Sequence, residues 1–312
     1  MPILAVVGPT ASGKSEVAMT VARGRIAAGQ PTEIVAVDAF TVYRGMDVGT
    51  AKPSRHDRDE VPHHLVDILD PWEELSVAGF QARARAAIDD VQDRGATPLL
   101  VGGSGLYWRA VVDELRFPPT DPTVRDELRQ RWADDPAAAH RHLATLDPDA
   151  AARIEPNNLR RTIRALEAIE LTGERFSRYD DAWERYDSRY PVLTVAYLEP
   201  PNDELRDRIA VRAARMVEGG LLEEAAALRA LPHPLSHTAQ QAIGYAEAFE
   251  ALDGRLDLTE LVDLIARRTW RFARRQRRWF RADPRCEPID PEDAIARLVG
   301  GSEGMGGHDR PS

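Results

Sequence analysis

A short loop near the N-terminus constrains this chain more than any other feature. It reads Gly8-Pro-Thr-Ala-Ser-Gly13-Lys14-Ser15, matches the pattern G-x-x-x-x-G-K-[ST], and stands between an apolar run and a helix-like stretch. Glycines let the backbone curl so that its N–H groups point at phosphate oxygens, and the helix N-terminus adds partial positive charge. The Lys14 ammonium supplies a full charge, and the Ser15 hydroxyl can ligate Mg²⁺. The sequence therefore predicts a diphosphate- or polyphosphate-binding loop with contacts from Gly8, Thr10, Ala11, Ser12, Gly13, Lys14 and Ser15.

Four short apolar runs have the length and composition of buried strands. They are Pro2–Gly8, Glu33–Asp38, Pro98–Gly103 and Val192–Leu198. Helix-like stretches separate them, among them Gly13–Ala28 and Val77–Arg94, the latter with Ser76 as a candidate N-cap. Strands that alternate with helices are typical of a parallel, doubly wound sheet. Together with the phosphate loop, this pattern predicts an α/β fold of the P-loop NTPase-like class.

About ninety residues between the third and fourth runs carry no strand signal. Four helix-like stretches fill them: Asp121–Trp132, Pro136–Leu146, Asp149–Ile154 and Asn158–Thr172. We therefore expect residues 121–187 to form a helical insertion that acts as a lid, and residues 1–120 with 188–299 to form the core domain. Further helices are expected over Asp203–Glu218, Leu221–Leu231, Ala239–Leu252 and Leu258–Arg278. The glycine-rich residues 300–312 are predicted to be a disordered tail.

Composition restricts the class of protein further. The chain has 43% hydrophobic residues and no apolar run of membrane-spanning length, so we expect a soluble globular protein. Cys286 is the only cysteine, which excludes an internal disulfide and a cysteine-rich zinc site. The N-terminus shows no basic region of a secretory signal. We expect a cytoplasmic monomer.

A basic segment near the C-terminus stands out against the net charge of −10. Bulk acidity argues against a nucleic-acid partner, but binding depends on a local patch. Eight arginines lie between Arg267 and Arg281, and on a helix one face would be formed by Arg267, Arg271, Arg274, Arg278 and Arg281. The opposite, apolar face would be formed by Leu258, Leu261, Ile265, Phe272 and Trp279. The row predicts a contact with a phosphate backbone, above all through Arg271, Arg274 and Arg278.

Six segments, in order, resemble the motifs of tRNA dimethylallyltransferases, also called isopentenyltransferases. The most specific is Asp38-Ala-Phe-Thr-Val-Tyr-Arg-Gly-Met-Asp-Val-Gly-Thr-Ala-Lys52-Pro53. The others are Pro62-His-His-Leu-Val-Asp, Gly102-Gly-Ser-Gly-Leu-Tyr107, Asn158–Glu167, Gln241-Ala-Ile-Gly-Tyr245 and Arg268-Thr…Arg275-Gln…Trp279-Phe-Arg281. The resemblance runs from about residue 3 to residue 283.

The resemblance implies a reaction and a set of site residues. Dimethylallyl diphosphate would be held by its diphosphate with Mg²⁺, and the N6 amine of the adenosine 3′ of the anticodon in tRNA would attack the allylic carbon. The catalytic residues that it implies are Asp38 as general base, Lys14 and Ser104. The tRNA contacts that it implies are Asp38, Ala39, Phe40, Thr41, Ser104, Arg125, Arg160, Arg161 and Arg164. Two alternatives stay open: Asp38 as a Walker-type carboxylate that holds magnesium directly or through one of the ion's ligands, and lid-helix arginines paired with Glu167 or Glu170.

The chain also departs from the family pattern. Asp38-Ala39-Phe40-Thr41 stands where the family usually has Asp-Ser-x-Gln, Arg160-Arg161 where it has Gln-Arg, and Ser104 where threonine is common. These changes leave the strictness of base recognition open. Three alternative functions stay open for this chain: a P-loop small-molecule kinase, a prenyltransferase that acts on free AMP, and a non-catalytic RNA-binding ATPase. A mononucleotide acceptor or a kinase would need neither the long insertion nor the arginine row.

Overall fold

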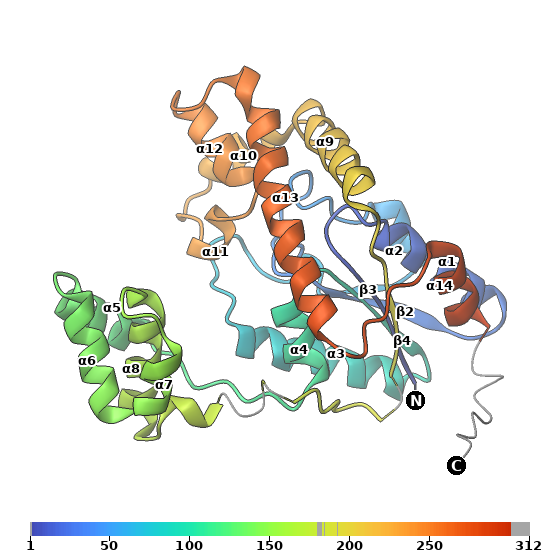
Figure 1. The fold of residues 1–312 in the computed structure, drawn as a ribbon. Helices are drawn as coiled ribbons and strands as arrows, with labels where there is room; N and C mark the ends of the chain where they lie inside the picture. The colour runs from blue at the N-terminus through green and yellow to red at the C-terminus, as the bar shows by residue number, and fades with distance from the viewer. Residues whose placement is uncertain (1, 180–182, 184, 192, 301–312) are drawn as a thin grey trace, which may run out of the picture. The chain divides into compact units, whose positions relative to one another are not determined.

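The computed structural model describes residues 2–179, 183, 185–191 and 193–300. Contacts divide the chain into two compact units. Met1–Val112 with Tyr190–Ser312 is called the core unit below, and Asp113–Arg189 is called the insertion unit. All named strands belong to the core unit, and the insertion unit is helical (Figure 1).

The sheet of the core unit has five parallel strands in the order β3-β2-β4-β1-β5. Their bounds are Ile3–Val7 (β1), Thr32–Val37 (β2), His63–His64 (β3), Thr97–Gly102 (β4) and Leu193–Tyr197 (β5). The α/β class and the four expected strands are confirmed. The edge strand β3 was not predicted, because two residues carry no readable periodicity.

Helices cover both faces of the sheet. On one face, α1 (Lys14–Ala27) and α14 (Pro291–Val299) pack over Leu4 and Val6 of β1. On the other, α3 (Val77–Asp93), α4 (Gly105–Val112) and α13 (Leu258–Ala282) pack over Ile3 and Ala5. Since consecutive residues of β1 are buried on opposite faces, the strand reads as an unbroken apolar run.

The remaining helices of the core unit are α2 (Arg55–Glu60), α9 (Asn202–Glu218), α10 (Leu221–Arg229), α11 (His237–Gln240) and α12 (Tyr245–Leu252). The long helix α13 lies alongside α9 (Figure 1). The predicted single helix over Ala239–Leu252 is wrong. The chain leaves the helical path between α11 and α12, where Gly244 has φ of 99°, a conformation that favours glycine.

Other boundaries differ by a few residues or less. Ser76 caps α3 as expected, because its hydroxyl accepts a hydrogen bond of 3.0 Å from Gly79 N. α13 continues past Arg278 to Ala282. Gly300 follows α14 as its C-cap, and residues 301–312, where a tail was expected, lie outside the described residues. No helix in the described ranges is long and apolar enough to cross a membrane.

The insertion unit contains α5 (Pro122–Trp132), α6 (Pro136–Leu146), α7 (Pro148–Arg153), α8 (Leu159–Thr172) and a 3₁₀ turn at Phe176–Tyr179. Three of these helices begin at an Asp-Pro pair, in which the aspartate side chain caps the helix and proline occupies its first turn. Leu128, Leu143 and Ile163 lie in its core. The unit therefore has a hydrophobic core of its own.

Candidate active site

The phosphate loop joins β1 to α1 in the predicted strand–loop–helix context. A Cβ atom on Gly8 would lie 2.4 Å from the carbonyl oxygen of Leu198, so the close approach of these backbones requires glycine. Gly13, the N-cap of α1, has φ of 89°, and Ala11 has φ of 61°. The Ser12 side chain is buried, and its hydroxyl has no hydrogen-bond partner in the described structure. The loop is thus tightly curled around the start of α1.

A cavity of about 850 Å³ opens beside this loop, entirely within the core unit. Its walls come from the phosphate loop, the end of β2, the segment 49–53, α9, residues 241–243 and α13. The predicted site residues that line it are Thr10, Lys14, Ser15, Asp38, Phe40, Thr41 and Arg271. The other predicted residues of the core unit lie outside its lining: Gly8, Ala11, Ser12, Gly13, Ala39, Ser104, Arg274 and Arg278.

Three charged groups gather at the phosphate-loop end of the cavity: Lys14, Arg212 and Asp38. Lys14 Nζ donates a hydrogen bond of 2.5 Å to the Pro9 carbonyl. Burial lowers the pKa of Lys14 to about 7, with the Arg212 guanidinium adding to the effect and the Asp38 carboxylate opposing it. Burial also lowers the pKa of Arg212. Two poorly solvated basic groups therefore face the space where the loop would hold an anion.

Sequence reasoning missed Arg212, which is one of many arginines on α9. Its Nη2 donates a hydrogen bond of 3.4 Å to the Thr50 carbonyl. Only the fold brings α9 close to the phosphate loop, so no local pattern in the sequence could single it out.

Asp38 follows the last residue of β2, at the carboxyl edge of the sheet. Its Oδ1 accepts hydrogen bonds from Phe40 N at 2.8 Å and Thr41 N at 3.3 Å. These bonds fix the carboxylate at the cavity wall. The neighbouring Thr41 hydroxyl is buried and has no hydrogen-bond partner within the described structure.

The glycine turn after β4 brings α13 against the phosphate loop. A Cβ atom on Gly103 would lie 2.6 Å from Gln276 Nε2 and 3.5 Å from Lys14 Nζ. Gln276 is buried, and its Oε1 accepts a hydrogen bond of 2.9 Å from Thr10 N. Sequence reasoning did not assign Gln276 a role. Ser104, the next residue after this turn, accepts a backbone hydrogen bond of 2.8 Å from Trp108 N at the start of α4.

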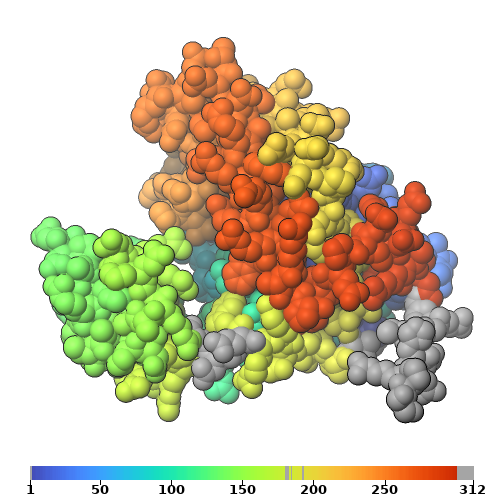
Figure 2. All heavy atoms as spheres, in the orientation of Figure 1, coloured from blue at the N-terminus to red at the C-terminus, as the bar shows by residue number. Residues whose placement is uncertain are grey.

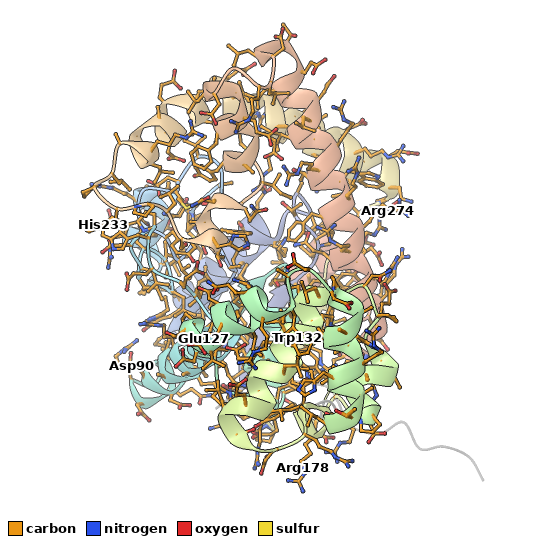
Figure 3. The ribbon with its side chains drawn as sticks, turned by 90° about the vertical axis from the view of Figure 1, so that its left-hand side faces the viewer. Asp90, Glu127, Trp132, Arg178, His233 and Arg274 are labelled. Carbon is orange, nitrogen blue, oxygen red and sulfur yellow. The ribbon has the colours of Figure 1, made fainter. Side chains whose placement is uncertain are left out.

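The arginine row on α13 is exposed. Its members are Arg267, Arg271, Arg274, Arg278 and Arg281. Arg281 forms an ion pair of 2.8 Å with Glu199, and within the described structure the other four have no ion pair. Figure 2 shows α13 at the surface, and in Figure 3 the Arg274 side chain points away from the ribbon.

The predicted apolar face of α13 is partly wrong. Leu258 is 58% exposed and Trp279 is 41% exposed. The second half of the helix buries Ala273, Gln276, Arg277 and Phe280 instead. The polar members of this set are paired: Arg277 forms an ion pair of 2.6 Å with Glu199. A polarity-based assignment misplaced this face, because two of its buried side chains are polar.

The four remaining predicted arginines belong to the insertion unit. Arg125 and Arg164 both pair with Glu167, which is fully buried, at 3.0 Å each. The alternative of an ion pair with Glu167 is therefore present for Arg164. Arg160 and Arg161, at the start of α8, are exposed and have no ion pair within the described structure.

Comparisons with known proteins identify what the chain resembles. A family model described as IPP transferase matches residues 41–283. A tRNA dimethylallyltransferase from Kineococcus radiotolerans is 49% identical over 313 residues, covering 96% of each chain. One from Bifidobacterium longum is 47% identical over 285 residues, covering 91% of this chain and 84% of its own.

Solved structures give the same result at the level of the fold. The tRNA isopentenylpyrophosphate transferase from Bacillus halodurans is 39% identical, with a TM-score of 0.68 over 96% of this chain and 94% of its own. A eukaryotic dimethylallyltransferase described as acting on tRNA is 25% identical, with a TM-score of 0.76 over 89% of this chain and 69% of its own.

Proposed function

This chain belongs to the IPP transferase family of tRNA dimethylallyltransferases, and we propose that it makes N6-isopentenyladenosine in tRNA. It is a transferase that moves a dimethylallyl group from dimethylallyl diphosphate to the exocyclic N6 of the adenosine 3′ of the anticodon. One observation in the structure supports this most directly. Residues of the phosphate loop, two poorly solvated basic groups and a carboxylate at a strand end line a single cavity.

The diphosphate is proposed to lie against the phosphate loop. Its contacts would be the predicted set: Gly8, Thr10, Ala11, Ser12, Gly13, Lys14 and Ser15. As the carbon–oxygen bond breaks, negative charge grows on the leaving diphosphate. Lys14 and Arg212 stabilise this charge best because they are already in place and poorly solvated.

A divalent ion fits the oxygen donors at this end of the cavity. The Ser15 hydroxyl and the Asp38 carboxylate both line it, and Mg²⁺ commonly binds one or two protein oxygens together with phosphate oxygens. We propose Ser15 as the protein ligand of Mg²⁺. When bound, the ion would neutralise part of the diphosphate charge.

Asp38 is proposed as the general base. The adenine N6 attacks the allylic carbon, the bond from that carbon to diphosphate oxygen breaks with its electrons leaving on oxygen, and an N6 proton passes to Asp38. Conjugation with the purine makes the amine a weak nucleophile, so a proton acceptor within hydrogen-bond reach assists the attack. The two backbone bonds to Oδ1 hold the carboxylate still for this step.

The tRNA is proposed to contact both units. The target base must leave the anticodon stack to enter a buried site. A cavity of about 850 Å³ is within the size range of small-molecule sites.

The tRNA contacts of the core unit are proposed to be of two kinds. Arg271, Arg274 and Arg278 would contact the phosphate backbone, and Ala39, Phe40, Thr41 and Ser104 would lie near the base. We propose that residues 121–187 of the insertion unit act as a lid, with tRNA contacts from Arg125, Arg160, Arg161 and Arg164.

We propose that the protein acts as a monomer in the cytoplasm, where tRNA is modified.

One assay separates this function from its alternatives. Purified protein is given radiolabelled dimethylallyl diphosphate with tRNA, with AMP, or with no acceptor, and a parallel reaction contains labelled ATP. We expect label to enter tRNA only. Label in AMP would assign a mononucleotide acceptor, and phosphate transfer from ATP would assign a kinase.

A further inference from the structure

The carboxylate of Glu224, on α10, is bound by consecutive backbone N–H groups of the segment 47–49. Asp47 N and Val48 N each donate to it at 3.0 Å, and Gly49 N donates at 3.4 Å. Successive N–H groups that converge on one point form an anion-binding nest. Here the anion is a side chain of the protein itself, 175 or more residues away in sequence.

Tyr245 closes the same nest. Its hydroxyl donates a short hydrogen bond to Glu224 and accepts one of 3.1 Å from Gly49 N. Burial and the Glu224 carboxylate raise the pKa of Tyr245, so the phenol remains a donor. A Cβ atom on Gly49 would lie 2.4 Å from the Tyr245 ring, so only glycine allows this approach. Gly49 and Tyr245 belong to two different motifs of the sequence, and Glu224 joins them.

The clamped segment leads into the wall of the cavity. Gly49, Thr50 and Ala51 line it, and the Thr50 carbonyl is the hydrogen-bond acceptor of Arg212. At the far end of the segment, the buried Lys52 ammonium bonds to the Tyr43 carbonyl at 2.7 Å and to Asp67 at 2.6 Å. The Thr50 carbonyl thus lies between two anchors, where it accepts the hydrogen bond from the Arg212 guanidinium.

We propose that Glu224 is a positioning residue for the reaction: it fixes the Thr50 carbonyl and through it the Arg212 guanidinium that faces the diphosphate. This inference rests on the proposed function. Among the described residues Arg212 forms no ion pair, so this poorly solvated guanidinium needs its acceptor in the right place. A displaced carbonyl would leave it free to rotate away. Glutamine at position 224 would have the same shape but one acceptor oxygen, and its NH₂ group would face backbone donors.

The test compares Glu224→Gln with Glu223→Gln, an exposed neighbour on the same helix turn. Binding of inorganic pyrophosphate with Mg²⁺ is measured by calorimetry, and steady-state kinetics are measured with dimethylallyl diphosphate and tRNA. For Glu224→Gln we expect about tenfold weaker pyrophosphate binding and a matching rise in KM for dimethylallyl diphosphate. KM for tRNA should stay within about twofold, and Glu223→Gln should match the wild type. Equal pyrophosphate affinity in both variants would overturn the proposal.

A double-mutant cycle with Arg212→Ala distinguishes positioning from a general loss of stability. If Glu224 acts through Arg212, the effect of Glu224→Gln on pyrophosphate binding should nearly vanish in the Arg212→Ala background. An undiminished effect there would refute the link. If Glu224→Gln does not fold, Tyr245→Phe takes its place in the test, because it keeps the ring and removes only the hydroxyl that binds Glu224. It should weaken pyrophosphate binding in the wild-type background but not in the Arg212→Ala background. Since pyrophosphate binding needs no tRNA, the outcome is separate from whether tRNA is the acceptor.

Discussion

The backbone nitrogen of Thr10 donates a hydrogen bond of 2.9 Å to the side-chain oxygen of Gln276, 266 residues later in the chain. The bond joins the phosphate loop to α13, whose outer side carries the arginine row. One rigid helix therefore touches the proposed diphosphate site and presents the proposed tRNA contacts.

Replacing Gln276 with methionine should loosen the phosphate loop. The variant keeps the length of the side chain but leaves Thr10 N without its acceptor. We expect KM for dimethylallyl diphosphate to rise about tenfold, the scale of losing one buried hydrogen bond, with KM for tRNA little changed. Gln30→Met, at an exposed position, is the matched control. An unchanged KM for dimethylallyl diphosphate would show that the loop holds its shape without Gln276.

Binding of dimethylallyl diphosphate should take up a proton at pH 8. The pKa of Lys14 is about 7 in the free protein, lowered by burial, so the amine is mostly neutral at pH 8. A bound diphosphate favours the charged form and raises this pKa, so the complex gains up to about one proton, and affinity should fall as pH rises above 7. Calorimetry in two buffers of different ionisation enthalpy measures the uptake.

Lys14→Arg is the control for this proton, because arginine stays charged throughout this range. The variant should show no uptake, and its turnover should fall by ~10² because the planar guanidinium fits the loop poorly. Proton uptake equal to that of the wild type would assign the proton to another group.

Asp38→Asn should slow turnover by ~10²–10⁴ while tRNA affinity stays near normal, the range for a lost general base. The amide oxygen can still accept the bonds from Phe40 N and Thr41 N, so the turn is preserved. Single-turnover rates and tRNA binding are measured across a magnesium series. Recovery of full turnover at high magnesium would instead make Asp38 a ligand of the ion.

Converting Arg271, Arg274 and Arg278 to glutamine should reduce the salt dependence of tRNA binding. Each phosphate contact contributes ~0.7–0.9 to the slope of log affinity against log salt concentration. A triple variant of Arg55, Arg83 and Arg297, which are exposed elsewhere on the core unit, has the same change in charge. Equal slopes in the two triple variants would show that the arginine row does not contact tRNA.

The double variant Thr41→Gln, Arg160→Gln should sharpen recognition of the bases beside the target adenosine. The Thr41 hydroxyl is buried and has no hydrogen-bond partner among the described residues, and the Arg160 side chain has donors but no acceptor. Each restored amide contact would add up to ~1–3 kcal/mol of discrimination. Turnover on anticodon stem-loops varied at the flanking bases gives the measurement. Unchanged selectivity would mean that the two departures from the family pattern are neutral.

Local sequence patterns predicted the fold well because its elements have strong local signals. β1 is an unbroken apolar run and β4 is apolar after Thr97, and the Asp-Pro pairs mark helix starts in the insertion unit. The exceptions have physical causes. β3 depends on pairing with β2, and the break before α12 depends on one backbone conformation at Gly244.

The residues of the candidate site also differ in whether a local sequence signal or only the tertiary fold identifies them. Lys14 and Asp38 could be found because each occupies a fixed place in a motif after a strand. Arg212 and Gln276 could not, since each lines the cavity from a helix that only the tertiary fold brings there. The same holds for Glu224, which contacts the segment 47–49 from α10. Arginine is so common in this chain that its presence at any one helical position carries little information.

The Glu167 carboxylate, shared by two arginines, affects how much side-chain entropy the insertion unit would lose on binding tRNA. It holds Arg125 through two hydrogen bonds of 3.0 and 3.1 Å and Arg164 through one of 3.0 Å, while Arg164 also donates to the carbonyls of Pro118 and Pro119. A free arginine side chain has about 2 kcal/mol of rotamer entropy, which is lost when the side chain is fixed. For these two side chains folding has already fixed the rotamers, whereas the exposed Arg160 and Arg161 would lose their freedom only when a partner binds. Arg125 and Arg164 should therefore provide contacts that select the geometry of the bound partner. Arg160 and Arg161 should provide a more adaptable and less selective attraction.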